Sequence, residues 1–172
     1  MLDIGCGSRW QGDVNMDLFT KSSSHRPGHP ELDPHLIQNF VLADAHALPF
    51  RTGSFNRVRA SHILEHLPRP LVALGEWLRV GRRVEVNVPF RNGLFDPWNG
   101  FLHKFKVHLW SFNKTWFLEY ARRQRLGVTV SYGHGMGPFP NEVKAWFVRQ
   151  SLDEETSGEA GGLTDDDYER EA

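Results

Sequence analysis

The sequence predicts an α/β fold with a doubly wound, mostly parallel sheet, an antiparallel hairpin at one edge, and a disordered acidic C-terminal tail. Three observations predict it. Short apolar runs alternate with turn and helix signals over the first 90 residues, the pattern of parallel strands joined by crossovers. Two further strand-like runs near residue 140 are too close together for a crossover connection. The last 22 residues are acidic and poor in apolar side chains.

The expected strands are short and carry apolar residues at alternating or continuous positions. Five of them lie in the first 90 residues, at 1–4, 13–18, 39–45, 55–61 and 83–90. Apolar residues at near-helical spacing predict a helix over 62–80, which Pro68 and Pro70 interrupt. An aromatic-rich segment from residue 91 is interpreted as a substrate-side loop or lid. It leads into a helix over 113–124, with Asn113 as the N-cap. The edge hairpin is expected at 128–134 and 142–150.

The chain is expected to form one domain, because 172 residues with 40% hydrophobic content suffice for a single core. That domain spans residues 1–150, and the tail spans 151–172. No apolar run approaches the ~20 residues that cross a bilayer, and no secretory signal is visible, so we expect no membrane partner. The single cysteine, Cys6, excludes an intramolecular disulfide framework and a Cys-rich zinc site. We expect a cytoplasmic protein in a reducing setting.

Charge is divided unevenly between the domain and the tail. The tail carries nine carboxylates and one arginine, a charge of −8. Residues 1–150 carry 19 Lys and Arg against 12 Asp and Glu, a charge of +7, together with all nine histidines. Two interpretations are open: the basic domain binds an anionic substrate or nucleic acid, or the tail is simply a solvated segment and the domain's charge has no partner.

A glycine turn follows the first strand in LDIGCG, at residues 2–7. Glycine permits positive φ and lets the backbone approach a ligand closely. The second and third strands end in Asp17 and Asp44, and ligands of open parallel sheets bind at the carboxyl ends of the strands. Asp17 can accept hydrogen bonds from two ribose hydroxyls, and Asp44 can accept one from an exocyclic amine. The pattern indicates a nucleoside pocket, whereas Trp10 breaks the Gly-x-Gly-x-x-Gly pattern of dinucleotide-binding enzymes.

Four motifs in order, LDIGCG, VNMDL, VLADAHALPF and FNRVRASHILEHLPRP, resemble those of class I S-adenosylmethionine-dependent methyltransferases. The resemblance covers roughly the first 90 residues and points to a small methyltransferase-11-like family with a Rossmann-like fold. The compact gap SRWQGD is similar to that of small methyltransferases that often accompany glycan-modifying enzymes. The chain begins at the first expected strand, without the N-terminal helix that usually covers the cofactor in proteins of this type.

The resemblance implies S-adenosylmethionine as the cofactor and assigns residues of the motifs to it. Asp3, Gly5 and Gly7 would line the methionine side, and Asp17 would hold the ribose. Asp44 and Ala45 would contact the adenine, and Ser61 and His62 would lie beside the sulfonium. The full set of expected cofactor-binding residues is Asp3, Gly5, Cys6, Gly7, Asp17, Leu18, Asp44, Ala45, Ser61 and His62.

Catalytic residues are harder to assign, because methyl transfer depends mainly on alignment of nucleophile, methyl and sulfur. A general base is needed only where the acceptor must lose a proton. The candidates are His62, Glu65, His66, His103 and His108. Each also has a structural interpretation. The first two histidines would pack at the start of the helix, the glutamate would cap a loop or reach the cofactor's amine, and the last two histidines would pack among aromatic residues.

The segment HILEH at 62–66 also matches the pattern of inverted zinc peptidases. His62 and His66, four apart on a helix, would share one face and could bind zinc. Glu76 or Glu85 would have to supply a third ligand. The methyltransferase resemblance explains the same segment, and we expect no metal.

The expected function is therefore methyl transfer from S-adenosylmethionine to an unidentified acceptor: a small molecule, a glycan or another anionic substrate. The alternative is a non-catalytic accessory module that retains a methyltransferase fold.

Overall fold

The strands form one seven-stranded sheet in the computed structural model, which describes residues 1–20, 31–90, 108–133 and 142–149. They are β1 (Leu2–Ile4), β2 (Val14–Asp17), β3 (Phe40–Leu42), β4 (Phe55–Ser61), β5 (Gly81–Pro89), β6 (Gly127–Gly133) and β7 (Glu142–Val148). The helical elements are the α-helices α1 (Pro70–Val80) and α3 (Lys114–Arg123) and the 3₁₀ turns η1 (Pro34–Leu36) and η2 (Leu64–His66).

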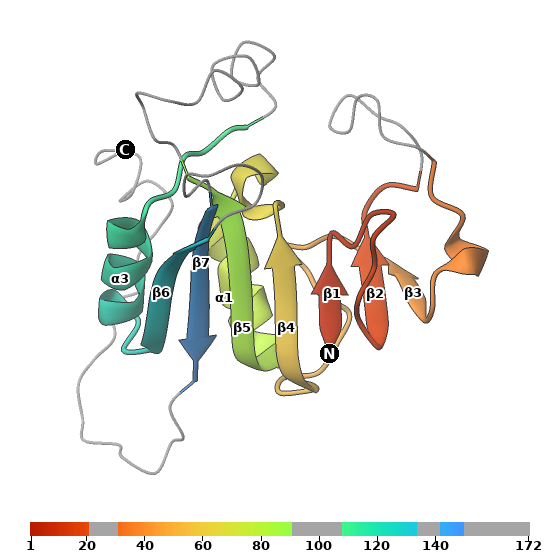
Figure 1. Cartoon of the computed structure of the whole chain (residues 1–172). Coiled ribbons are helices and arrows are strands. Elements are labelled where there is room, and N and C mark those ends of the chain that lie inside the picture. Colours follow the sequence, from red (N-terminus) through yellow and green to blue (C-terminus); the bar gives the residue numbers. More distant parts are fainter. Residues whose placement is uncertain (21–30, 91–107, 134–141, 150–172) are drawn as a thin grey trace.

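The strand order is β3-β2-β1-β4-β5-β7-β6 (Figure 1). Strand β7 is antiparallel to both of its neighbours, and the other pairs are parallel. This confirms the predicted Rossmann-like α/β fold with an antiparallel hairpin. The hairpin folds back so that β7 lies between β5 and β6, and β6 forms the edge.

The elements differ from the prediction at two places near the carboxyl ends of strands. Strand β3 ends at Leu42, so Asp44 lies two residues beyond it. The predicted helix over 62–80 is wrong in its first part: η2 is a short 3₁₀ turn, and α1 begins only at Pro70. Proline lacks a backbone N–H and fixes φ, so it breaks a helix interior but fits the first helical position. Residues 91–107 of the predicted lid, which include His103, and the acidic tail at 151–172 lie outside the described residues.

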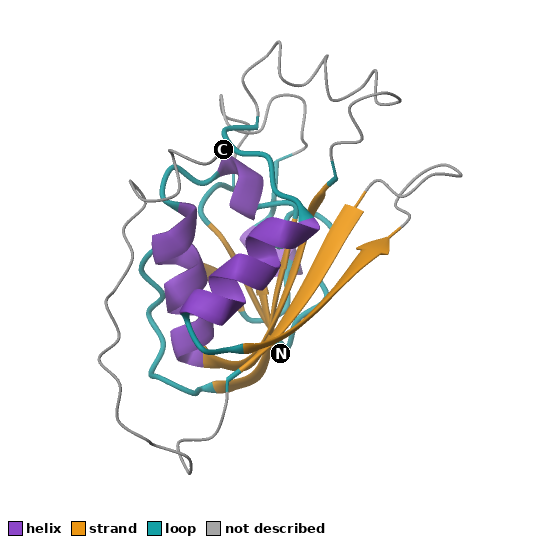
Figure 2. Ribbon diagram, turned by 90° about the vertical axis from the view of Figure 1, so that its left-hand side faces the viewer, coloured by secondary structure: helices purple, strands orange, loops and turns teal. Residues whose placement is uncertain are grey.

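One face of the sheet carries the core. Both α1 and α3 pack on this face (Figure 2). Apolar side chains at alternating positions of β4, β5 and β7 are fully buried beneath them, as with Val58, Val86 and Phe147. Trp77 of α1 is completely buried, and its indole Nε1 donates to the Ala45 carbonyl at 3.1 Å. The side chain of Asn113, the predicted N-cap of α3, accepts a hydrogen bond from the Trp116 backbone N–H at 2.8 Å, which confirms that cap.

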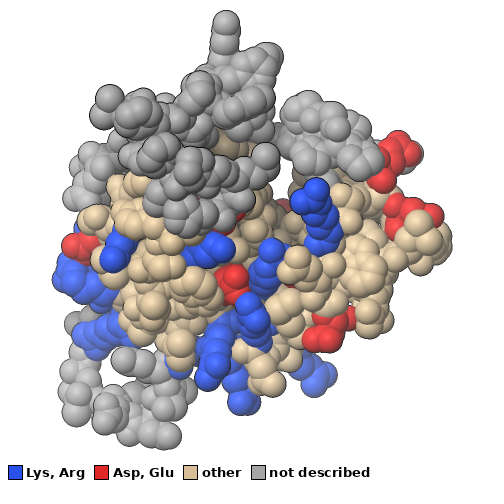
Figure 3. All heavy atoms as spheres, in the orientation of Figure 1, with Lys and Arg blue, Asp and Glu red and all other residues tan. Residues whose placement is uncertain are grey.

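The other face of β1, β4 and β5 is polar. Asp3, Arg59 and Glu85 are register partners across these three strands, and Arg57 pairs with the Glu85 carboxylate. Lys and Arg side chains gather on this face toward the lower ends of β4 and β5 (Figure 3). Arg83, next to Arg57 in the register, is exposed there. Two ion pairs, Arg57 with Glu85 and Arg59 with Asp3, join charged side chains across this face.

Candidate cofactor and acceptor site

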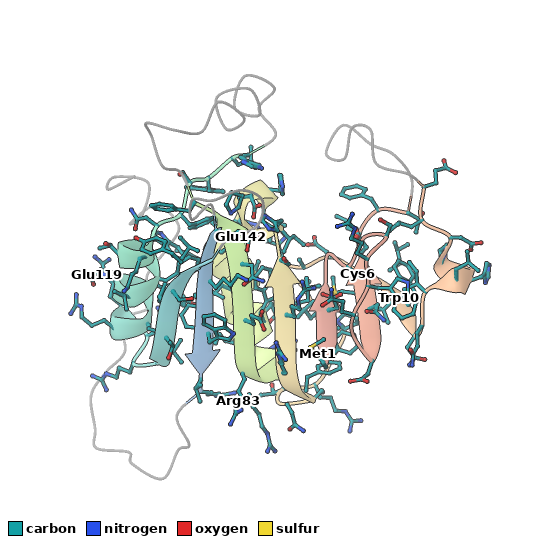
Figure 4. All side chains as sticks on the ribbon, viewed as in Figure 1. Met1, Cys6, Trp10, Arg83, Glu119 and Glu142 are labelled. Atoms are coloured by element: carbon teal, nitrogen blue, oxygen red, sulfur yellow. The ribbon has the colours of Figure 1, made fainter. Side chains whose placement is uncertain are left out.

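The strand order reverses between β1 and β4, because the chain runs from β1 outward to β3 and then returns to the other side. In open α/β sheets, ligands bind outside the carboxyl ends of the strands at this switch point. The carboxyl ends of β1, β2 and β4 meet at the upper edge of the sheet in Figure 1. Cys6 and Glu142 lie toward this edge, opposite Met1 and Arg83 (Figure 4). The predicted site residues therefore come from the edge at which a ligand is expected.

The glycine turn after β1 has the backbone that only glycine adopts without strain. Gly5 has φ +64° and Gly7 has φ +54°. A Cβ added to Gly5 would lie 2.7 Å from Cδ1 of Ile63, so residue 5 is closely packed against the segment that follows β4. Between the two glycines, the buried Cys6 donates its backbone N–H to the Met16 carbonyl at 3.0 Å. The turn is thus fixed to β2 and to the residues after β4.

Asp17 joins the end of β2 to this turn. The carboxylate is buried, with 6% of the residue exposed. Its Oδ2 accepts the Gly7 backbone N–H at 3.1 Å, and its Oδ1 accepts the Phe19 backbone N–H at 3.1 Å. Leu18, the next residue, is exposed at this edge.

Asp3 lies in β1 on the polar face and is almost completely buried. Its carboxylate accepts the Gln11 backbone N–H at 2.9 Å and contacts Nη1 of Arg59 at 3.2 Å. Burial raises the pKa of Asp3, and the Gln11 and Arg59 donors oppose that effect. This carboxylate closes the short connection between β1 and β2.

The loop after β3 presents Asp44 and Ala45. Oδ1 of Asp44 accepts the His46 backbone N–H at 2.9 Å and lies 2.7 Å from Nδ1 of the same histidine. The backbone donor lowers the pKa of Asp44. Ala45 is buried beneath Trp77, and Glu76 of α1 accepts the Leu48 backbone N–H at 3.0 Å. Helix α1 therefore positions this loop.

His62 follows Ser61 at the end of β4 and has φ +55°, a conformation that residues other than glycine rarely adopt. Its backbone N–H donates to the Asn87 carbonyl at 2.8 Å. Its ring lies between two carboxylates, with Nε2 at 3.0 Å from Oε1 of Glu142 and Nδ1 at 3.6 Å from Oε1 of Glu65. The Glu65 carboxylate raises the pKa of His62 against the effect of burial, and Glu142 adds to the increase. Backbone strain of this kind is concentrated at functional sites.

The remaining candidates lie in and beside η2. Glu65 is buried, and His66 and His108 are close to it. The expectation that His62 and His66 share a helix face is wrong, because His62 precedes η2 in a left-handed conformation. Neither glutamate considered as a third zinc ligand is available there, because Glu85 pairs with Arg57 and Glu76 pairs with Arg79.

Three contributors to this edge were not predicted. Arg59 pairs with Asp3 across 56 positions of sequence, and Glu142 pairs with His62 across 80. Ile63 packs against Gly5. These three contacts depend on the register of the strands and on the hairpin returning beside β5. The alternation of apolar and polar residues along a strand does not reveal either feature.

The residues at the edge fit the nucleoside-containing cofactor that the motifs imply. The turn has two glycines at positive φ, and the buried Asp17 carboxylate accepts the Gly7 backbone N–H beside it, where ribose hydroxyls are expected. Asp44 stands after the neighbouring strand with a lowered pKa, so it is anionic and able to accept from an amine. The donor set therefore suits a ribose and an adenine side by side along β2 and β3.

Comparison with known proteins supports the fold. Residues 2–83 match the family model described as "Methyltransferase domain". No curated protein matches the sequence. Among the described residues, none of the helices has the length and apolar character that crossing a bilayer requires.

Solved structures of methyltransferases share the fold. One, from Thermotoga maritima, is described as a S-adenosylmethionine-dependent methyltransferase and possible histamine N-methyltransferase; it is 15% identical, with a TM-score of 0.61 over 86% of this chain and 81% of that one. Another, from Archaeoglobus fulgidus, is 14% identical, with a TM-score of 0.58 over 86% and 85%. A third, from Methanosarcina mazei, is 16% identical, with a TM-score of 0.57 over 86% and 91%. At these identities the likeness shows the fold alone.

Proposed function

We propose that this chain is a class I S-adenosylmethionine-dependent methyltransferase and that it transfers a methyl group to an anionic acceptor, a proposal supported by the methyltransferase-domain match over residues 2–83 and by the shared fold. The single observation that supports the cofactor site is the Asp17 carboxylate, buried at the end of β2 and bonded to the Gly7 N–H of the glycine turn. The cofactor supplies an electrophilic methyl group on a sulfonium. The acceptor class we infer is a small molecule, a glycan or another anionic substrate, in a cytoplasmic setting.

The residues of this chain divide into those that hold the cofactor and those that face the acceptor. Asp3, Gly5 and Gly7 would line the methionine portion, and Asp17 the ribose. The Ala45 backbone, held by Trp77, would form the adenine side together with Asp44 and Leu18. Ser61 and Cys6 complete the set next to the turn.

His62 and its neighbours are the residues that we place on the acceptor side. Glu65 and Glu142 raise the pKa of His62, which favours the cationic form of its ring, and a cation there suits an anionic acceptor better than it suits proton abstraction. We therefore propose orientation of the acceptor as the role of His62. The open basic face below it, with exposed Arg57 and Arg83, would add long-range attraction for an anion.

The first test is calorimetric titration of the full chain with S-adenosylmethionine. Asp17→Ala should weaken binding by about 1.5–3 kcal/mol, roughly 10- to 150-fold, the range for hydrogen bonds to a charged group. Because the carboxylate also holds Gly7, Asp17→Asn is the companion variant, with folding checked by circular dichroism. Glu119→Gln, on the distant helix α3, is the matched control and should bind as the unmodified chain does. Equal affinity in all four proteins would remove Asp17 from the ribose site.

The second test separates an enzyme from an accessory module. Transfer of labelled methyl groups from S-adenosylmethionine is measured against nucleic-acid, glycan, protein and small-molecule fractions of a lysate. Label in one fraction, lost when His62→Ala is used, supports methyl transfer with His62 on the acceptor side. Binding of the cofactor with no transfer to any fraction supports the non-catalytic module.

A further inference from the structure

Three side chains that could bind a metal converge at the edge of the sheet. One ligand atom each from Glu65, His66 and His108 lies within 4.8 Å of the other two. Nε2 of His66 is 3.8 Å from Oε1 of Glu65, and the two imidazole rings meet edge to face with centroids 4.8 Å apart. Bonds of about 2.1 Å to a central ion would bring these atoms together with shifts of about an ångström.

The Glu65 carboxylate gives an independent reason to expect a ligand. Its side chain is only 2% exposed, and neither Oε1 nor Oε2 has a hydrogen-bond partner among the described residues. The nearest ring nitrogens, of His62 and His66, are at 3.6 and 3.8 Å, too long for hydrogen bonds. A buried carboxylate without donors is costly, and such groups in native proteins are normally paired or bound to metals. Glu65 is directed at the two histidines, where a cation would satisfy it.

The backbone around the cluster is well fixed. The Leu109 and Trp110 N–H groups donate to the Glu65 carbonyl at 2.8 and 3.2 Å, and the Trp110 indole donates to the Leu67 carbonyl at 2.8 Å. These three bonds hold the segment that carries His108 against η2. In metal sites, hydrogen bonds from surrounding groups orient the ligand side chains. The three bonds named here fix the backbone on both sides of this cluster.

We propose that Glu65, His66 and His108 bind a divalent transition-metal ion. Two imidazoles and one carboxylate are the donor set of zinc and related ions with an open position, whereas Mg²⁺ and Ca²⁺ prefer oxygen ligands throughout. The site adjoins the glycine turn, because Ile63, between His62 and η2, packs on Gly5. The site does not depend on the chain's being an active methyltransferase.

This site differs from the inverted zinc peptidase pattern that HILEH matches. In that pattern both histidines of 62–66 are ligands on one helix. Here only His66 of the pair joins the cluster, the glutamate of the motif becomes a ligand, and the third ligand comes from a segment 42 positions downstream of His66. A hydrolytic role is therefore not part of the proposal.

The experiment uses the full chain with any affinity tag removed, because tag histidines bind the same ions. Zn²⁺ is titrated calorimetrically, and Co²⁺ is added separately to record its visible absorption. We expect one Zn²⁺ per chain, and a loss of at least tenfold in affinity in both Glu65→Gln and His108→Ala. His35→Ala, at an exposed histidine in η1, is the matched control and should bind as the unmodified chain does.

Thermal unfolding provides a readout that does not depend on activity. Zn²⁺ should raise the melting temperature of the unmodified chain and of His35→Ala, and not that of the two cluster variants. If Glu65→Gln does not fold, His108→Ala decides the question. No saturable binding by the unmodified chain, or equal Zn²⁺ affinity in the control and in His108→Ala, would overturn the site.

Discussion

Alanine at Gly5 is the substitution for which the structure makes the sharpest energetic prediction. Two costs are added. A left-handed conformation at φ +64° costs a residue with a Cβ about 1–2 kcal/mol. The new Cβ would also lie 2.7 Å from Cδ1 and 3.2 Å from Cβ of Ile63, and overpacking of this kind costs about 1–3 kcal/mol. Because the side chain of Ile63 is only partly buried and can shift, we expect about 2–4 kcal/mol for Gly5→Ala.

Two matched variants separate these costs. Gly53 has φ +69° and open space where a Cβ would lie, so Gly53→Ala reports the conformational cost alone, about 1–2 kcal/mol. Ile63→Val removes Cδ1, the atom nearest the new methyl group, so the cost of Gly5→Ala should fall by about 1 kcal/mol in that background. Denaturant unfolding of the four combinations at positions 5 and 63, together with Gly53→Ala, measures both differences. If Gly5→Ala costs no more than Gly53→Ala and does not change with residue 63, the close packing of the glycine turn is wrong.

Two further predictions concern pH and charge. Bonds from Arg79 and from Leu48 lower the pKa of Glu76, so its contribution to stability is full above the ordinary glutamate pKa of 4.5 and is lost as pH falls through the lower folded value. The stability difference between the unmodified chain and Glu76→Gln, measured by urea unfolding, should therefore shrink from pH 6 to pH 3, and a constant difference would contradict it. Deleting residues 151–172 should leave the melting temperature within a few degrees. It should also increase retention on heparin at low salt but not at about 1 M salt, where the Debye length is about 3 Å. Identical elution at every salt concentration would show that the tail does not compete for the basic domain.

Much of the fold could be predicted because local signals and tertiary structure agree. The strand predicted at 55–61 is β4 with the same bounds, and its apolar residues Val58 and Ala60 are fully buried. Asn113 was recognisable as a cap because a single side chain and a single backbone N–H decide it. The glycine turn and Asp17 were recognisable because strand ends mark them. The turn directly follows β1, and Asp17 is the last residue of β2.

The segment from residue 62 to 69 could not be predicted, since two tendencies compete there. Ile63, Leu64 and Leu67 have the spacing of a helix, but Pro68 and Pro70 prevent one from continuing. The left-handed φ of His62 then turns the chain away from β4, and a non-glycine residue gives no sign of this. The sequence also gives no sign that His108 lies near Glu65. Two hydrogen bonds, from the backbone N–H groups of the two residues after His108 to the Glu65 carbonyl, bring the segments together.

The short connection between β1 and β2 and the polar face of the sheet are two parts of one arrangement. Residues 5–13 contain no helix, and they are held instead by polar bonds: Gln11 N–H to Asp3, and Gly12 N–H to Asn15 at 2.8 Å. A helix packed over this face would need apolar partners on β1 and β4, where the chain has Asp3 and Arg59. The charged residues on this face of the sheet and the short, helix-free connection from β1 to β2 therefore go together. Asp3, which holds the connection next to the glycine turn, depends for its position on Arg59 and not on apolar packing. The Asp3–Arg59 pair therefore couples the charges of the polar face to the geometry of the glycine turn.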